Sequence, residues 1–120
     1  MNTINDIADA VHANAIEKGF HDFNEPIKHF VEFQINNLHD EVSELHEALR
    51  AGKFLQPCDK AELMQKFGLE PLNCAEEEYA DIIIRSLDQC RRLGIDIQRA
   101  IEIKHAFNKT RPYRHGGKLS

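Results

Sequence analysis

Two pairs of carboxylates in the chain share one spacing. Glu41 and Glu44 lie three residues apart, and so do Glu78 and Asp81. Residues three apart project from one face of an α-helix, so two such helices packed together bring four carboxylates to one site. Hard oxygen ligands suit Mg²⁺, or Mn²⁺ in its place, rather than zinc. The spacing therefore predicts a magnesium site, whose ion also stabilises the fold because it relieves repulsion among like charges.

The alternative is that these acidic residues are solvated helix surface, which is usual for a single ExxE pattern. Against it, Glu41 lies at the edge of an apolar stripe made by Leu38, Val42, Leu45 and Leu49. Glu78 and Asp81 lie roughly opposite Ile83 and Leu87, where a two-layer packing would place solvent. Apolar residues nevertheless spread over more than half of this helix, which predicts cover on several sides and a second subunit.

Basic and amide side chains near the C-terminus are candidates for binding phosphate. They continue the angular stripe begun by Ile97 and Ile101, at positions i, i+4 and i+7: Lys104, Asn108 and Arg111. Polar groups on a buried face need partners, and a triphosphate would supply them, with arginine as a bidentate fork. His115 and Lys118, in a glycine-containing tail, would close over it. Taken alone, basic residues here would simply complement the helix dipole.

The elements that position these residues are all predicted to be helical. Apolar residues recur with helical spacing in four segments, at about residues 4–15, 27–49, 75–90 and 97–107. Gly19, Gly52 and Gly94 follow the first three segments, as expected at helix C-termini, and Asp96 is placed to cap the fourth. Four helices with mostly short connections predict an all-α, antiparallel four-helix bundle.

Two segments interrupt or follow this pattern. Residues from about 52 to 74 read as an insertion, a loop carrying one short helix for which Asp59 and Glu62 offer a capping box. From about residue 110 to 120, Pro112 and two glycines predict an extended tail. The length of 120 residues fits one domain over residues 1–120.

Composition narrows the class of protein. A formal charge of -5 argues against a nucleic-acid polymer as partner, because such binders usually carry a basic excess. No apolar run approaches the roughly 20 residues of a membrane-spanning helix. The three cysteines are an odd number without a CxxC pair, which predicts reduced thiols in a cytoplasmic protein. P-loop, GxGxxG and GxSxG motifs are absent from the sequence, so their chemistries have no support.

The acidic motifs resemble those of a known family. The runs Asp40-Glu41-Val42-Ser43-Glu44-Leu45 and Glu77-Glu78-Tyr79-Ala80-Asp81 are similar to the EExxE and ExxD motifs of the MazG-like all-α nucleotide pyrophosphatases. The run at 108–118 looks like the Asn-x-x-Arg-Pro and His-Gly-Gly-Lys ending of small phage-type and bacterial members. Two features depart from the family pattern: Asp40 stands where glutamate is common, and the interval between Glu44 and Glu78 is longer than in compact members.

The resemblance implies an activity and a set of roles. It implies Mg²⁺-dependent hydrolysis of a (deoxy)nucleoside triphosphate between the α and β phosphates, for nucleotide-pool control or removal of aberrant nucleotides, by a homodimer or homotetramer. It further implies that the two carboxylate pairs bind the metal, that Glu41 or Asp40 acts as general base, and that phosphates contact Lys104, Asn108, Arg111 and Lys118. A non-catalytic helical module that binds a nucleotide or a partner stays open as the alternative, and a purely structural bundle is the third hypothesis.

Overall fold

The structure is a computed structural model that describes residues 2–112. All its regular elements are helices: α1 (Ile4–Glu17), α2 (Ile27–Arg50), α3 (Ala61–Lys66), α4 (Cys74–Arg92) and α5 (Ile97–Lys109). This confirms the all-α prediction. None of the helices in residues 2–112 is long and apolar enough to cross a membrane.

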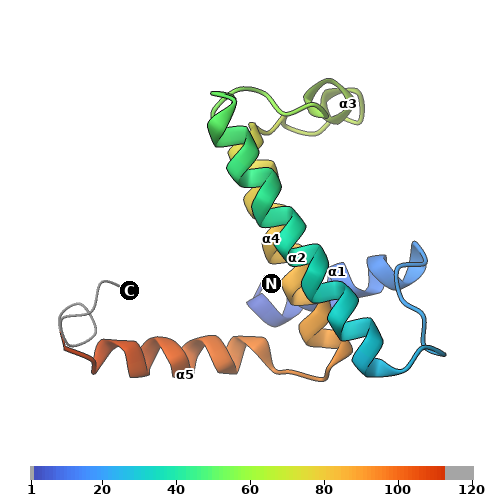
Figure 1. Ribbon diagram of the computed structural model, residues 1–120, viewed down its shortest axis with the longest axis vertical. Coiled ribbons are helices and arrows are strands. Elements are labelled where there is room, and N and C mark those ends of the chain that lie inside the picture. Colours follow the sequence, from blue (N-terminus) through green and yellow to red (C-terminus); the bar gives the residue numbers. More distant parts are fainter. Residues whose placement is uncertain (1, 113–120) are drawn as a thin grey trace.

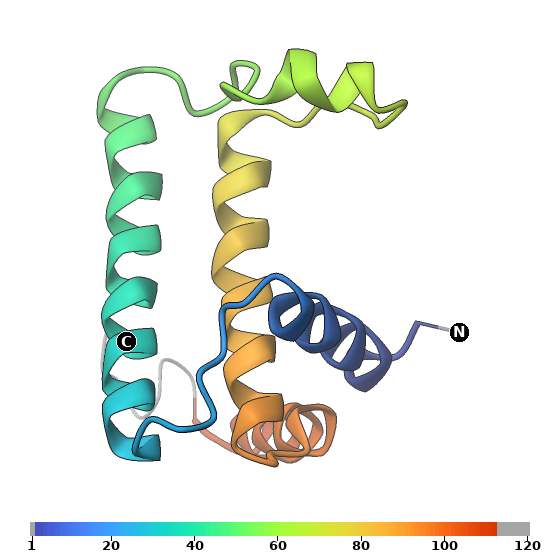
Figure 2. The same ribbon diagram turned by 90° about the vertical axis from the view of Figure 1, so that its right-hand side faces the viewer.

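Helix α4 is the centre of the fold. It runs antiparallel to α2 along most of its length, and α1 packs across its C-terminal half (Figure 2). The buried apolar side chains are few, namely Ala8, Phe30, Cys58, Ala75 and Leu87. The radius of gyration is 17.0 Å, against about 14 Å for a compact domain of this length. One chain therefore has an open rather than a compact shape, with a small core.

Side-chain caps define the starts of three helices. Thr3 caps α1 and Asn73 caps α4, each through a capping box completed three residues later. Asp96 accepts a hydrogen bond from the backbone of Arg99 and caps α5, as its position predicts. The capping box expected from Asp59 and Glu62 does not form. Helix α3 begins at Ala61 and has no side-chain cap, because its first turn follows Lys60 rather than Asp59.

The insertion lies at the end of the α2 and α4 pair that is remote from α1 and α5 (Figures 1 and 2). Two backbone hydrogen bonds close it, from Cys58 N–H to Leu72 and from Cys74 N–H to Gln56, with N···O distances of 3.0 and 2.9 Å. Together they make an isolated antiparallel bridge that brings the start of α4 next to the loop after α2. The predicted loop with one short helix is therefore present.

Helix α5 extends away from the other helices (Figure 1). Its start is held on α1 by the side chain of Asn5, whose Nδ2 donates to Asp96 at 2.9 Å and whose Oδ1 accepts from the Gln98 backbone N–H at 3.2 Å. Residues 101–110 are all exposed. Within residues 2–112, α5 does not complete a four-helix bundle with α2 and α4, because it leaves them after the turn at Gly94.

Candidate functional site

Two polar stripes face each other across the α2 and α4 pair. On α2 the stripe consists of Gln34, Asn37, Glu41 and Glu44, and on α4 it consists of Glu78, Asp81, Arg85 and Asp88. In both, the spacing is i, i+3, i+7 and i+10, which keeps the four side chains on one helix face. Because the helices are antiparallel, Glu44 meets the start of α4, and Gln34 meets its C-terminal half.

Three of the predicted metal ligands are brought together. Glu41, Glu44 and Glu78 each offer a carboxylate oxygen, and these oxygens all lie within 4.8 Å of one another. Glu41 is only 7% exposed, Glu78 is half-buried and Glu44 is exposed. Asp81, the fourth predicted ligand, lies outside this group of three but borders the pocket beside it. The cluster is therefore buried at Glu41 and open to solvent at Glu44.

Two oxygens of this cluster lack partners. Glu41 Oε2 and Glu78 Oε2 are buried and accept no hydrogen bond within residues 2–112. Leaving a buried carboxylate oxygen without a donor is costly, and most such atoms in folded proteins find a partner. An oxygen-only donor set with two unsatisfied buried oxygens fits a hard divalent cation such as Mg²⁺.

The charge of the cluster perturbs its acidity. Burial, and then the neighbouring charges of Glu44, Asp81 and Glu41, raise the pKa of Glu78 to about 7. Burial, followed by the charge of Glu41, also raises the pKa of Asp81. Burial and like charges both disfavour the ionised carboxylate, and a bound cation would favour it. Near neutral pH, proton and cation therefore compete for this site.

Two cations pair with acidic residues here, one with Glu41 of the cluster and one with Glu77 next to Glu78, and neither is among the residues predicted from the sequence. Arg85 Nε lies 2.8 Å from Glu41 Oε1 and so satisfies the other oxygen of that carboxylate. Lys60, from the insertion, lies 3.4 Å from Glu77, which is 8% exposed. The position of Arg85, four residues after Asp81 on one helix face, is the signal that could have identified it.

A pocket of about 690 Å³ adjoins the carboxylates. It lies between α1, α2 and α4, and Phe20 of the loop between α1 and α2 and Phe33 of α2 contribute to its apolar lining. Its polar lining consists of Asn14, Gln34, Asn37, Asp81, Arg85 and Asp88. Ligand pockets commonly combine an apolar wall with a few polar groups that fix orientation. Glu41, Glu44 and Glu78 do not line the pocket, but Arg85 does and also pairs with Glu41, so the pocket lies next to the cluster.

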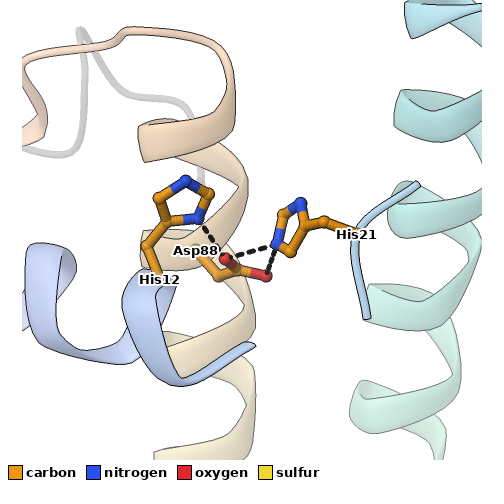
Figure 3. Close-up of side chains that lie close together, drawn as sticks. All are labelled: His12, His21 and Asp88. Carbon is orange, nitrogen blue, oxygen red and sulfur yellow. Dashed lines mark hydrogen bonds and ion pairs between the residues drawn. The ribbon is translucent and has the colours of Figure 1, made fainter. Parts of the chain in front are cut away.

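Two histidines that are distant in sequence meet at Asp88 (Figure 3). His12 Nδ1 lies 2.7 Å from Asp88 Oδ1, and His21 Nε2 lies 2.8 and 2.9 Å from the two Asp88 oxygens. On the other side of the ring, Arg92 Nη1 lies 2.8 Å from His21 Nδ1. These histidines are scattered in the sequence, with no spacing that indicates the cluster, and the His21 side chain is fully buried.

The predicted phosphate-binding residues of α5 are not brought to the carboxylates within one chain. Lys104, Asn108 and Arg111 are exposed, on a helix that extends away from α2 and α4. Instead, the Lys104 ammonium and the Arg111 guanidinium lie 5.1 and 5.9 Å from the centre of the Phe107 ring. The prediction that they occupy a buried face is wrong for the single chain, because nothing in residues 2–112 covers that face.

Three further predicted residues have less structural support. Asp40 is exposed on α2 and is not in the group of three close carboxylates. His115 and Lys118 lie outside the described residues. Comparison of the chain with protein-family models, curated proteins and solved structures gave no match. Support for a function therefore comes from the chemistry of the described residues and the resemblance of the motifs.

Proposed function

We propose that this protein is a Mg²⁺-dependent nucleotide pyrophosphohydrolase that cleaves a (deoxy)nucleoside triphosphate between its α and β phosphates. The observation that carries the proposal is the pair of buried, unpartnered oxygens on Glu41 and Glu78, close to Glu44 and beside a pocket large enough for a nucleoside. A site of this kind combines ligands for a cation, which would neutralise phosphate charge during phosphoanhydride hydrolysis, with an adjoining pocket for the nucleoside.

The residues divide into recognisable roles. Glu41, Glu44, Glu78 and Asp81 hold the cation, and Mg²⁺ bound there would neutralise phosphate charge and lower the pKa of a coordinated water. Glu41 is better placed than Asp40 as the general base, because it is buried in the cluster whereas Asp40 is exposed. Arg85, which lines the pocket, orients Glu41 through their ion pair.

Within residues 2–112, apolar surface on α4 and α5 is left uncovered, which supports a homo-oligomer. Ile83 on α4 is 56% exposed, and Ile103 and Phe107 on α5 are 53% and 54% exposed. Apolar surface on this scale usually marks an interface. Docking these faces in a homodimer or homotetramer would complete the four-helix bundle with a partner's helices. It would also bring Lys104, Asn108 and Arg111 next to the carboxylates of another copy.

Oligomerisation is tested by subunit complementation. Glu44→Gln removes a cation ligand and Arg111→Ala removes a phosphate contact, so each homo-oligomer should be nearly inactive. Co-expressed and purified together through two different tags, the two variants should regain part of the activity, because some sites combine both intact residues. Sedimentation of the wild type as a monomer, or mixed oligomers no more active than either parent, would contradict a site shared between subunits.

The activity itself is tested with a nucleotide panel. Purified protein is incubated with standard and modified ribo- and deoxyribonucleoside triphosphates, with Mg²⁺ or with chelator, and pyrophosphate is detected. We expect pyrophosphate from at least one nucleotide and only in the presence of Mg²⁺. Release from no nucleotide, combined with nucleotide-dependent thermal stabilisation, would instead support a binding module without turnover.

A further inference from the structure

The pocket beside the carboxylates contains a second acidic group that the proposed hydrolysis does not use. Asp88 is 8% exposed and lines the pocket, and it lies on α4 seven residues beyond Asp81. It is absent from the group formed by Glu41, Glu44 and Glu78. A carboxylate buried this far is normally paired with hydrogen-bond donors, and the donors around Asp88 indicate what this residue does.

The contacts of Asp88 fix both histidine tautomers. An arginine can only donate, so His21 Nδ1 accepts from Arg92 and His21 Nε2 must carry the hydrogen that is donated to Asp88. His12 Nδ1, at 2.7 Å, donates to the same carboxylate. A protonated Nε2 has no lone pair for a metal, which disfavours a second metal centre at His12, His21 and Asp88. The two N–H groups instead donate to Asp88, whose oxygens therefore act as acceptors.

The same network positions one wall of the pocket. The Arg92 guanidinium lies 4.2 Å from the centre of the Phe23 ring and 4.0 Å from that of Phe30, and it donates to the Asp22 carbonyl at 2.9 Å. These contacts fasten the loop between α1 and α2 to the end of α4. Because Phe20 belongs to this loop and lines the pocket, fixing the loop also fixes an aromatic side chain in the lining that it shares with Asp88.

A buried amide is the second polar group without an assigned role. Gln34 is 7% exposed and lines the same pocket, and its side-chain amide makes no hydrogen bond within residues 2–112. Only its backbone carbonyl is used, as an acceptor from Gln89 at 3.2 Å. The amide nitrogen and oxygen of Gln34 keep some access to solvent, so a ligand in the pocket can pair with them. The amide offers a ligand both a donor and an acceptor.

We propose that Asp88 and Gln34 recognise the edge of the nucleobase and select bases that carry an exocyclic amino group. Because the Asp88 oxygens act as acceptors, they pair with the amino group of cytosine or adenine and repel the carbonyl oxygen that replaces it in uracil or hypoxanthine. Gln34 then pairs with the neighbouring ring positions, and Phe20 or Phe33 offers a stacking surface. This inference rests on the proposed function only in that the pocket holds the nucleoside part of the substrate.

The test compares matched bases in a binding experiment that needs no turnover. Calorimetric titration with Mg²⁺ uses the α,β-methylene triphosphates of cytidine, uridine, adenosine and inosine, which resist cleavage between the α and β phosphates. We expect the amino-bearing member of each pair to bind at least about 100-fold more tightly, as for sites built around a substrate hydrogen bond. Equal affinity within both pairs, or binding of none of the four, overturns the inference.

Two variants separate recognition from folding. Asp88→Asn should reduce the preference within each pair by at least about tenfold, because an amide can also donate to a carbonyl. Gln34→Met, similar in volume, should weaken binding of the preferred nucleotides without lowering the melting temperature, since the amide has no partner in the protein. Unchanged preference in folded Asp88→Asn, or unchanged affinity in Gln34→Met, contradicts the assignment.

The outcomes also distinguish this inference from the proposed activity. Selective binding of amino-bearing nucleotides without any pyrophosphate release would overturn the proposed hydrolysis and leave the base recognition intact. Pyrophosphate release at equal efficiency from cytidine and uridine triphosphates would overturn the base recognition and leave the proposed hydrolysis intact.

Discussion

Glu41→Gln is expected to lower kcat/KM for the best nucleotide by at least about 10³-fold, through loss of a metal ligand and of the general base. Glutamine keeps the length and shape of the side chain but removes the charge that balances Arg85 and binds the cation. The loss should therefore appear with little change in the helical circular dichroism spectrum. Steady-state kinetics with pyrophosphate detection provide the measurement.

Asp40→Asn is the matched control, because it removes one negative charge from the neighbouring position. Asp40 is exposed and outside the group of close carboxylates, so this variant should leave kcat/KM nearly unchanged. Comparable losses in the two variants would mean that Asp40 participates in the chemistry. Full activity of Glu41→Gln would remove the basis of the proposed site.

The second large effect concerns pH and stability of the metal-free protein. The pKa of Glu78 is raised from 4.5 to about 7 in the folded state. Between these pH values the folded state keeps a proton that the unfolded state has released. The free energy of unfolding must then decrease as pH rises through this window, and the contribution is fully lost above the folded pKa. The raised pKa of Asp81 acts in the same direction.

Urea unfolding in chelator, followed from about pH 4.5 to 8, measures this decrease. Mg²⁺ should restore stability most strongly at the upper end, where the carboxylates are ionised and the cation displaces no proton. Glu78→Gln should remove much of the pH dependence, because glutamine does not titrate. Two results would contradict the claim that burial and like charges raise the pKa of Glu78. One is a metal-free protein whose stability rises with pH across the window, and the other is a slope of stability against pH that Glu78→Gln leaves unchanged.

The helices were predictable because their signals are local. Apolar spacing located α1, α2, α4 and α5, and the capping residue Asp96 marked the start of α5. The spacing of Glu41, Glu44 and Glu78 alone is typical of solvated helix surface, and the place of Glu41 at the edge of an apolar stripe was needed to predict that their oxygens meet. The capping box at Asp59 failed because a short helix in an insertion has too few turns for its start to be fixed by sequence alone.

Long-range features could not be read from local patterns. His12 and Asp88 are 76 positions apart, and His21 reaches them from a loop, so only the tertiary fold brings them together. The direction of α5 after Gly94 depends on contacts with α1 and, under the proposed function, on another copy of the chain. The stripe of Gln34 and Asn37 on α2 did carry a signal, because it continues the face of Glu41 and Glu44.

The most direct test of the central claim is the identity of the products. Phosphorus NMR of the preferred triphosphate, incubated with protein and Mg²⁺, distinguishes cleavage between the α and β phosphates from cleavage between the β and γ phosphates. The predicted result is nucleoside monophosphate and pyrophosphate in equal amounts, abolished by chelator and by Glu44→Gln. Formation of nucleoside diphosphate and inorganic phosphate, or hydrolysis that survives Glu44→Gln, would contradict a metal-dependent pyrophosphohydrolase at this carboxylate cluster.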